Sequence, residues 1–152
     1  MKLYFDMDGT FVNLYGVDNW LYMLQSYDKS PYETAKPLCD MRIFARLLNK
    51  LHKKGAELYI ISWLSKGATE KYEKDVTRAK KQWLKKHLKS VQWNDIYIVP
   101  YGEDKTLYAD DYGILFDDEE RNREIWQAEK GDAFDEKNMI NILKTLDKFN
   151  KI

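Results

Sequence analysis

The chain has 152 residues, of which 44% are hydrophobic and 33% charged, a composition typical of one globular domain with a buried core. Its 25 acidic and 25 basic side chains balance, which excludes a strong overall attraction to nucleic acid or anionic membranes, and no apolar run could span a bilayer. Because the single cysteine, Cys39, excludes an internal disulfide and the N-terminus lacks the features of a secretory signal, we expect a reducing, cytoplasmic location.

Four short segments rich in Ile, Leu, Val, Tyr or Phe are predicted to be strands, at residues 2–6, 57–62, 96–99 and 113–116. Near-continuous apolar strands of this length are typical of a parallel sheet that is covered on both faces. Helical patterns separate and follow them, at residues 40–55, 69–89 and 136–149. The alternation predicts a three-layer α/β/α, Rossmann-like fold with a central parallel sheet, in which ligands bind beyond the carboxyl ends of the strands.

Residues 11–37 interrupt this alternation directly after the first strand. Aromatic and polar residues alternate in this segment, and Pro31 and Pro37 interrupt it. We predict a short helix around residues 19–26, then a turn with room for a second short helix. We interpret the segment as a small lid inserted into a single domain that comprises residues 1–152.

Polar side chains gather where the predicted strands end. They are Asp6, Asp8, Ser62, Lys105, Asp117 and Asp118. Because the carboxyl ends of parallel strands meet at one edge of a sheet, we expect these side chains to form one site. Asp6 and Asp8 should converge, since positions two apart in a strand point the same way. Taken alone, these two residues also fit an ordinary exit from a strand into an Asp-Gly turn.

A cleft that holds four carboxylates needs a divalent cation, because the charges repel one another and lose hydration. Oxygen ligands of this kind favour Mg²⁺, which binds a few carboxylates together with water and phosphate. Gly9 gives the chain room to turn and lets backbone N–H groups face an anion. The sequence therefore predicts a site for Mg²⁺ and a phosphorylated ligand.

The order of these motifs resembles that of the haloacid dehalogenase (HAD) superfamily of phosphotransferases. The resemblance consists of DMDGT after an apolar strand, a serine at a strand end, a downstream lysine and an apolar strand that ends in DD, and it spans residues 3–122. The segment DKTLYADDYGILFDDEERN, residues 104–122, is similar to the stretch that carries the lysine and the double aspartate in 5'(3')-deoxyribonucleotidases.

The resemblance implies a role for each of these residues. Asp6 would be the nucleophile that forms an aspartyl-phosphate, and Asp8 the general acid and base. Ser62 would bind a phosphoryl oxygen and Lys105 would balance the charge around it. The implied Mg²⁺ ligands are Asp117, Asp118, Asp6 and the main-chain carbonyl of Asp8. An aspartate at position 8 favours phosphoryl chemistry over the cleavage of a carbon–halogen bond.

The substrate implied by the resemblance is a small phosphorylated molecule, with a nucleoside monophosphate as the first expectation. Nucleotidases of this type carry a larger helical cap, whereas only about 25 residues remain for one here. Three alternatives therefore stay open: a phosphatase for another small metabolite, a phosphatase for a nucleic-acid 3' end, and a non-catalytic phosphate-binding module. The sequence carries no signal for a membrane partner or for an oligomer.

Two groups of side chains have competing interpretations. The aromatic residues Tyr15 and Trp20, with Tyr22 and Tyr27, either stack on a substrate base or pack onto the core, and we favour packing. Trp63 either lines the cleft or packs beneath it. The lysines at positions 80, 81, 85, 86 and 89 form a basic strip on the long helix. We interpret this strip as a solvated face and not as a surface for nucleic acid.

Overall fold

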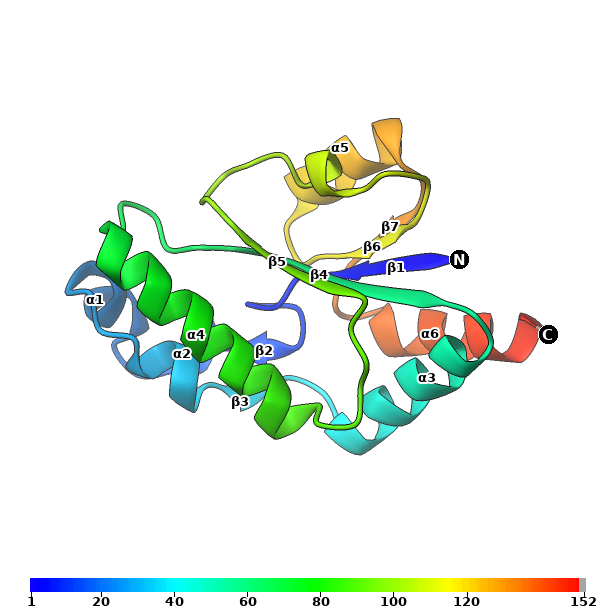
Figure 1. Ribbon diagram of the computed structural model, residues 1–152, viewed down its shortest axis with the longest axis horizontal. Helices are drawn as coiled ribbons and strands as arrows, with labels where there is room; N and C mark the ends of the chain where they lie inside the picture. Colours follow the sequence, from blue (N-terminus) through cyan, green and yellow to red (C-terminus); the bar gives the residue numbers. More distant parts are fainter. Residues whose placement is uncertain (151–152) are drawn as a thin grey trace.

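A parallel sheet of five strands forms the centre of the protein, whose computed structural model describes residues 1–150 (Figure 1). Its strands are β1 (Lys2–Phe5), β4 (Glu57–Trp63), β5 (Asp95–Val99), β6 (Ile114–Phe116) and β7 (Ala133–Phe134). They lie in the order β5-β4-β1-β6-β7, so β1 occupies the middle. The predicted three-layer, Rossmann-like α/β fold is confirmed, and residues 151 and 152 of the predicted domain lie outside the described residues.

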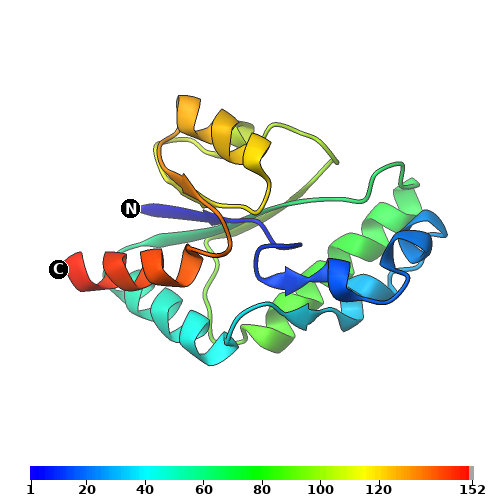
Figure 2. The ribbon, with the colours of Figure 1, turned by 180° about the vertical axis from the view of Figure 1, so that it is seen from behind.

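Helices cover both faces of the sheet (Figures 1 and 2). One face carries α3 (Met41–Lys53), α4 (Glu70–His87) and α6 (Met139–Phe149), and the other carries η2 (Lys105–Tyr108) and α5 (Glu120–Glu129). Strand β1 serves both layers because its side chains alternate. Phe5 belongs to the cluster formed with the first set of helices, whereas Tyr4 packs with Trp126 of α5.

Polar caps fix the beginnings of the two long helices. The Asp40 carboxylate accepts hydrogen bonds from the backbone N–H groups of Arg42 and Ile43 at the start of α3. The Thr69 hydroxyl accepts one from Tyr72 N at the start of α4. Each cap satisfies N–H groups that have no partner within the helix, typically worth about 1 kcal/mol. The caps place the N-terminus of each helix at the residues predicted from the sequence.

Strand β7, at one edge of the sheet, and helix α5 beside it were not predicted. Strand β7 has only two residues, and α5 is rich in charge with Trp126 as its buried residue. Neither therefore produces a sustained apolar pattern. In addition, α6 begins at Met139 and not at residue 136. Both unpredicted elements matter for the site, because α5 follows the aspartates at the end of β6 and Phe134 O of β7 accepts a hydrogen bond from Asp117 N.

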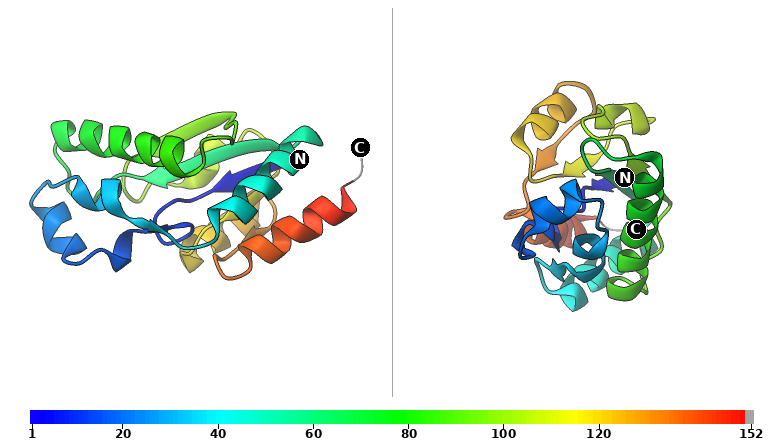
Figure 3. Two further views of the ribbon diagram at one scale, coloured as in Figure 1. Left: turned by 90° about the horizontal axis from the view of Figure 1, so that it is seen from below. Right: turned by 90° about the vertical axis from the view of Figure 1, so that its left-hand side faces the viewer.

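The segment after β1 forms a small helical insertion, which we define as residues 11–37. It contains β2 (Val12–Asn13), η1 (Leu14–Gly16), α1 (Trp20–Gln25), α2 (Ser30–Thr34) and β3 (Lys36–Pro37). Strands β2 and β3 pair antiparallel and bring its two ends together. Figure 3 shows the insertion alongside α4, and two hydrogen bonds connect them, from Tyr72 Oη to Asp28 O and from Trp83 Nε1 to Ala35 O.

Candidate active site

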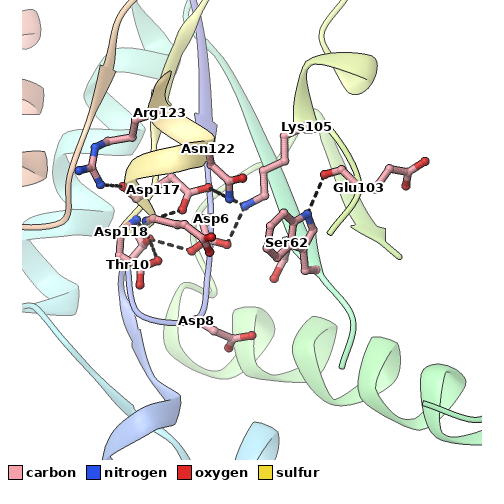
Figure 4. A network of polar contacts seen from close by, with 12 residues as sticks. Asp6, Asp8, Thr10, Ser62, Glu103, Lys105, Asp117, Asp118, Asn122 and Arg123 are labelled. Atoms are coloured by element: carbon pink, nitrogen blue, oxygen red, sulfur yellow. Dashed lines mark hydrogen bonds and ion pairs between the residues drawn. The ribbon is translucent and has the colours of Figure 1, made fainter. Parts of the chain in front are cut away.

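A cavity of about 290 Å³ lies at the carboxyl edge of the sheet, between the strand ends and the insertion. Its polar lining includes Asp6, Asp8, Lys105, Asp117 and Asp118, five of the residues that the sequence places at strand ends. The topology explains this, since β1 and β6 are parallel neighbours and both end at this edge. Figure 4 shows these side chains together.

Lys105 joins the ends of the two central strands. Its Nζ lies 2.9 Å from Asp6 Oδ1 and 2.7 Å from Asp117 Oδ2, and all three residues are buried. Burial alone would lower the pKa of the Lys105 ammonium, but the two carboxylates raise it above its ordinary value. Lys105 is therefore a fixed positive charge at the centre of the site.

Asp6, Asp117 and Asp118 form a group that fits a hard metal ion. One carboxylate oxygen from each lies within 4.8 Å of the other two. Burial, followed by the repulsion of Asp6, raises the pKa of Asp118 to about 9 and that of Asp117 to about 6. Such crowding of oxygen donors disfavours ionisation until a cation is bound, and the donor set is the one that Mg²⁺ prefers.

Two polar residues that the sequence analysis did not select hold this group in place. Thr10 Oγ1 donates to Asp6 Oδ2 at 2.9 Å and accepts from Asp118 N at 3.1 Å, so one hydroxyl connects both strand ends. Asn122 Nδ2 donates to Asp117 Oδ2 at 3.1 Å. Both residues belong to motifs already quoted, DMDGT and DDEERN, and their hydrogen-bonding side chains were the available signal.

Asp6 and Asp8 line the same cavity, but Asp8 stands apart from the group that the other three aspartates form. Figure 4 shows the Asp8 carboxylate turned away from the other aspartates, because the strand ends before it and the chain turns there. Asp8 points instead to Lys80 of α4, whose Nζ lies 2.8 Å from Asp8 Oδ2. Burial raises the pKa of Asp8 above its ordinary value, although the Lys80 ammonium opposes this shift.

The interpretation of Lys80 as part of a solvated strip is wrong. Lys80 is 1% exposed, whereas its neighbours Lys81, Lys85, Lys86 and Lys89 are exposed as expected. The signal was present in the helical spacing. Lys80 lies four residues after Val76 and three before Trp83, on the buried face of α4.

Ser62 occupies a different place from the one that the resemblance implies. Its side chain is fully buried, and Oγ accepts a hydrogen bond from Lys80 Nζ at 2.7 Å. Among the described residues that line the cavity, Ser62 is missing, while Ser65 from the following loop is present. The role of Ser62 as a phosphate ligand therefore stays a prediction.

Aromatic and aliphatic side chains form the outer wall of the cavity. Tyr15 and Trp20 line it with ring centroids 4.9 Å apart, and Trp63 lines it from β4. Trp63 Nε1 donates to Glu103 O, and Lys105 Nζ lies 5.4 Å from the centre of the Trp63 ring. The preference for packing onto the core is wrong for Tyr15, which is 52% exposed, and all six residues of α1 remain at least partly exposed.

A second hollow of about 890 Å³ lies between α3 and the end of α4. Basic and apolar side chains line it, including Arg42, Arg46, Lys86 and Lys89. Within the described residues its lining contains no carboxylate, whereas the cavity at the sheet edge brings several together.

No protein-family model matches the chain, and no curated protein matches it either. Within residues 1–150, none of the helices combines the length and apolar character needed to cross a membrane.

Proposed function

We propose that the chain is a HAD superfamily phosphatase, which hydrolyses phosphomonoesters with the help of Mg²⁺ and through an aspartyl-phosphate. The observation that carries the proposal is the group of Lys105, Asp6 and Asp117, with Asp118 beside it, at the carboxyl edge of a parallel sheet. Asp8 lines the same cavity. The order of the motifs along the chain adds independent support.

The carboxylates of Asp6, Asp117 and Asp118 would hold the Mg²⁺ ion. Ionised, these three carboxylates carry two more negative charges than Lys105 balances, and a divalent cation supplies that difference. When bound, the ion would neutralise charge on the transferring phosphoryl group.

The first half of the reaction uses Asp6 and Asp8. A carboxylate oxygen of Asp6 attacks phosphorus, and the bond between phosphorus and the ester oxygen breaks. Asp8 gives its proton to the departing oxygen, which leaves as an alcohol. The raised pKa of Asp8 supports this role, because a buried carboxyl keeps its proton to higher pH.

The second half restores the enzyme. Asp8, now ionised, takes a proton from water while the water oxygen attacks phosphorus. The bond between phosphorus and Asp6 breaks, which releases inorganic phosphate and leaves Asp8 protonated for the next cycle. Lys105 stays beside Asp6 through both steps and stabilises the carboxylate as nucleophile and as leaving group.

A nucleoside monophosphate is the substrate class that we propose first. The floor of the cavity contains both carboxylates and the Lys105 ammonium, and its outer wall includes Tyr15, Trp20 and Trp63. Such aromatic faces suit a planar base, and stacking on one typically contributes about 1–3 kcal/mol.

The test is phosphate release from nucleoside 5'- and 3'-monophosphates, sugar phosphates and a 3'-phosphorylated oligonucleotide, with Mg²⁺ or with EDTA. We expect release from the nucleotides only, dependent on Mg²⁺, and reduced by at least about 10³-fold in Asp6→Asn. Asp111→Asn, an exposed position outside the cavity, is the matched control and should retain full activity.

Full activity in Asp6→Asn would contradict the proposed nucleophile. Release from the sugar phosphates or the oligonucleotide alone would support one of the other phosphatase alternatives. Binding of phosphate without turnover of any ester would favour the non-catalytic phosphate-binding module.

A further inference from the structure

The Lys80 ammonium is fixed in three directions. Its Nζ lies 2.8 Å from Asp8 Oδ2, 2.7 Å from Ser62 Oγ and 2.6 Å from Trp63 O. An ammonium group has three N–H donors and no acceptor, so these three oxygens use all of them. Lys80 therefore has no N–H left for a substrate, and its influence on the reaction must pass through the groups that it holds.

Of those groups, Asp8 is the one that lines the cavity. Lys80 supplies the one side-chain hydrogen bond that Asp8 makes within residues 1–150, and it engages Oδ2. The other carboxyl oxygen, Oδ1, remains for a ligand or a proton. Ser62 and Trp63, at the end of β4, anchor the ammonium from behind.

The scaffold behind this contact is closely packed. Lys80 lies on the buried face of α4, and the Tyr32 ring of the insertion lies 5.2 Å from its Nζ. Trp83, one helical turn further along α4, donates to Ala35 O and connects the helix to the end of the insertion. The position of Lys80 is thus defined by the sheet, the helix and the insertion together.

We propose that Lys80 is a positioning residue for the general acid, which holds the Asp8 carboxyl so that Oδ1 faces the departing oxygen of the substrate. The inference rests on the proposed phosphatase function. Asp6 and Asp8 then have separate lysines: Lys105 holds the nucleophile, and Lys80 holds the acid.

The kinetic test compares phenyl phosphate with p-nitrophenyl phosphate, two esters of similar size. Phenolate is the poorer leaving group and depends more on a proton from Asp8. In Lys80→Met we expect kcat/KM to fall by about 10²-fold for phenyl phosphate and by much less for p-nitrophenyl phosphate, because the acid is misplaced. Lys81→Met, an exposed neighbour on α4, should leave both values unchanged.

The ratio of the two kcat/KM values does not depend on how much of a variant is folded, since that fraction cancels. A ratio in Lys80→Met equal to that of the wild type would overturn the proposal, even if both activities fell. A changed ratio with unchanged values in Lys81→Met would support it.

A second readout does not require activity. A buried ammonium with three acceptors exchanges its protons slowly with water, so its ¹H–¹⁵N signal should be visible in protein labelled with ¹⁵N-lysine. We expect a signal that is lost in Lys80→Met and shifted in Asp8→Asn and in Ser62→Ala. A Lys80 signal whose chemical shift is unchanged in Asp8→Asn would overturn the contact. If the wild type hydrolyses neither ester, the assay with nucleoside monophosphates decides the phosphatase proposal, and the NMR result alone decides whether Lys80 holds Asp8.

Discussion

A side chain at Gly9 would overlap the carboxylate of Asp118. The loop after β1 therefore passes directly against the aspartate that follows β6, and only a hydrogen fits between them. Gly9 also has a φ of +85°, a conformation that other residues adopt at a cost. These two constraints explain why the turn after Asp6 contains glycine.

Replacing Gly9 by alanine should displace Asp118 and weaken Mg²⁺ binding. Gly67→Ala is the matched control, because Gly67 also has a positive φ, +68°, but an added Cβ there meets open space. Both variants should lose about 1–2 kcal/mol of unfolding free energy to backbone strain, measured in urea. Only Gly9→Ala should also lose Mg²⁺ affinity by calorimetry, and equal affinities in the two variants would contradict the contact.

Binding of Mg²⁺ should release a proton. The pKa of Asp118 is raised to about 9, so the carboxyl is protonated at pH 7 and must ionise to bind the metal. We expect release of roughly one proton per Mg²⁺ at pH 7, and an affinity that rises about tenfold per pH unit up to pH 9. Calorimetry in buffers with different ionisation enthalpies measures this, and Asp118→Asn should abolish most of the release.

Two tryptophans allow a direct test of one buried hydrogen bond. Trp126 Nε1 donates to Gly113 O at 3.0 Å, whereas within residues 1–150 the buried Trp93 Nε1 has no partner. Trp126→Phe leaves a carbonyl unpaired, and Trp93→Phe removes an N–H that was already unpaired. We therefore expect Trp126→Phe to cost roughly 1–3 kcal/mol more unfolding free energy in urea. Equal costs would show that the Trp126 bond contributes little.

The aromatic wall should affect substrate binding more than chemistry. Trp20→Ala removes a ring that lines the cavity beside Tyr15 and leaves in place the carboxylates that we propose to react. For a nucleoside monophosphate we expect KM to rise roughly 10-fold with little change in kcat, a loss of about 1.4 kcal/mol of stacking. Inhibition by inorganic phosphate should stay the same, and a parallel loss of phosphate inhibition would argue against base recognition by Trp20.

Acid should destabilise the protein partly through His87. Its ring lies 4.1 Å from that of Trp83, and burial, followed by the charge of Lys86, lowers its pKa below the ordinary 6.5. The unfolded chain therefore takes up a proton first, so stability is complete above pH 6.5 and is lost as the pH falls through the folded pKa. His87→Phe should lose less stability than the wild type between pH 7.5 and pH 5, measured by urea unfolding.

Apolar pattern and motif order were sufficient to predict the central sheet, its four longer strands and the strand-end aspartates. The direction of a side chain beyond a strand was not predictable in the same way. Asp8 lies three residues beyond Phe5, the last residue of β1, so strand alternation no longer applies and its carboxyl turns to α4. The burial of Lys80 was not predicted because lysine is rarely buried, although its helical position matched that of apolar neighbours. Strand β7 and α5 are too short or too polar to show a pattern.

Strands β2 and β3 pair antiparallel, Val12 with Pro37 and Asn13 with Lys36. This pairing has a consequence for the design and evolution of such proteins. The chain leaves the sheet and returns to it where these two strands pair, so a longer segment could be inserted between them without changing the order of the strands. Such an insertion would not move Asp6 or Lys105, because Asp6 follows β1 and Lys105 belongs to η2. The size of the segment over the cavity can therefore change while the strand ends stay constant, provided that Leu14 and Tyr32 keep their packing against α4.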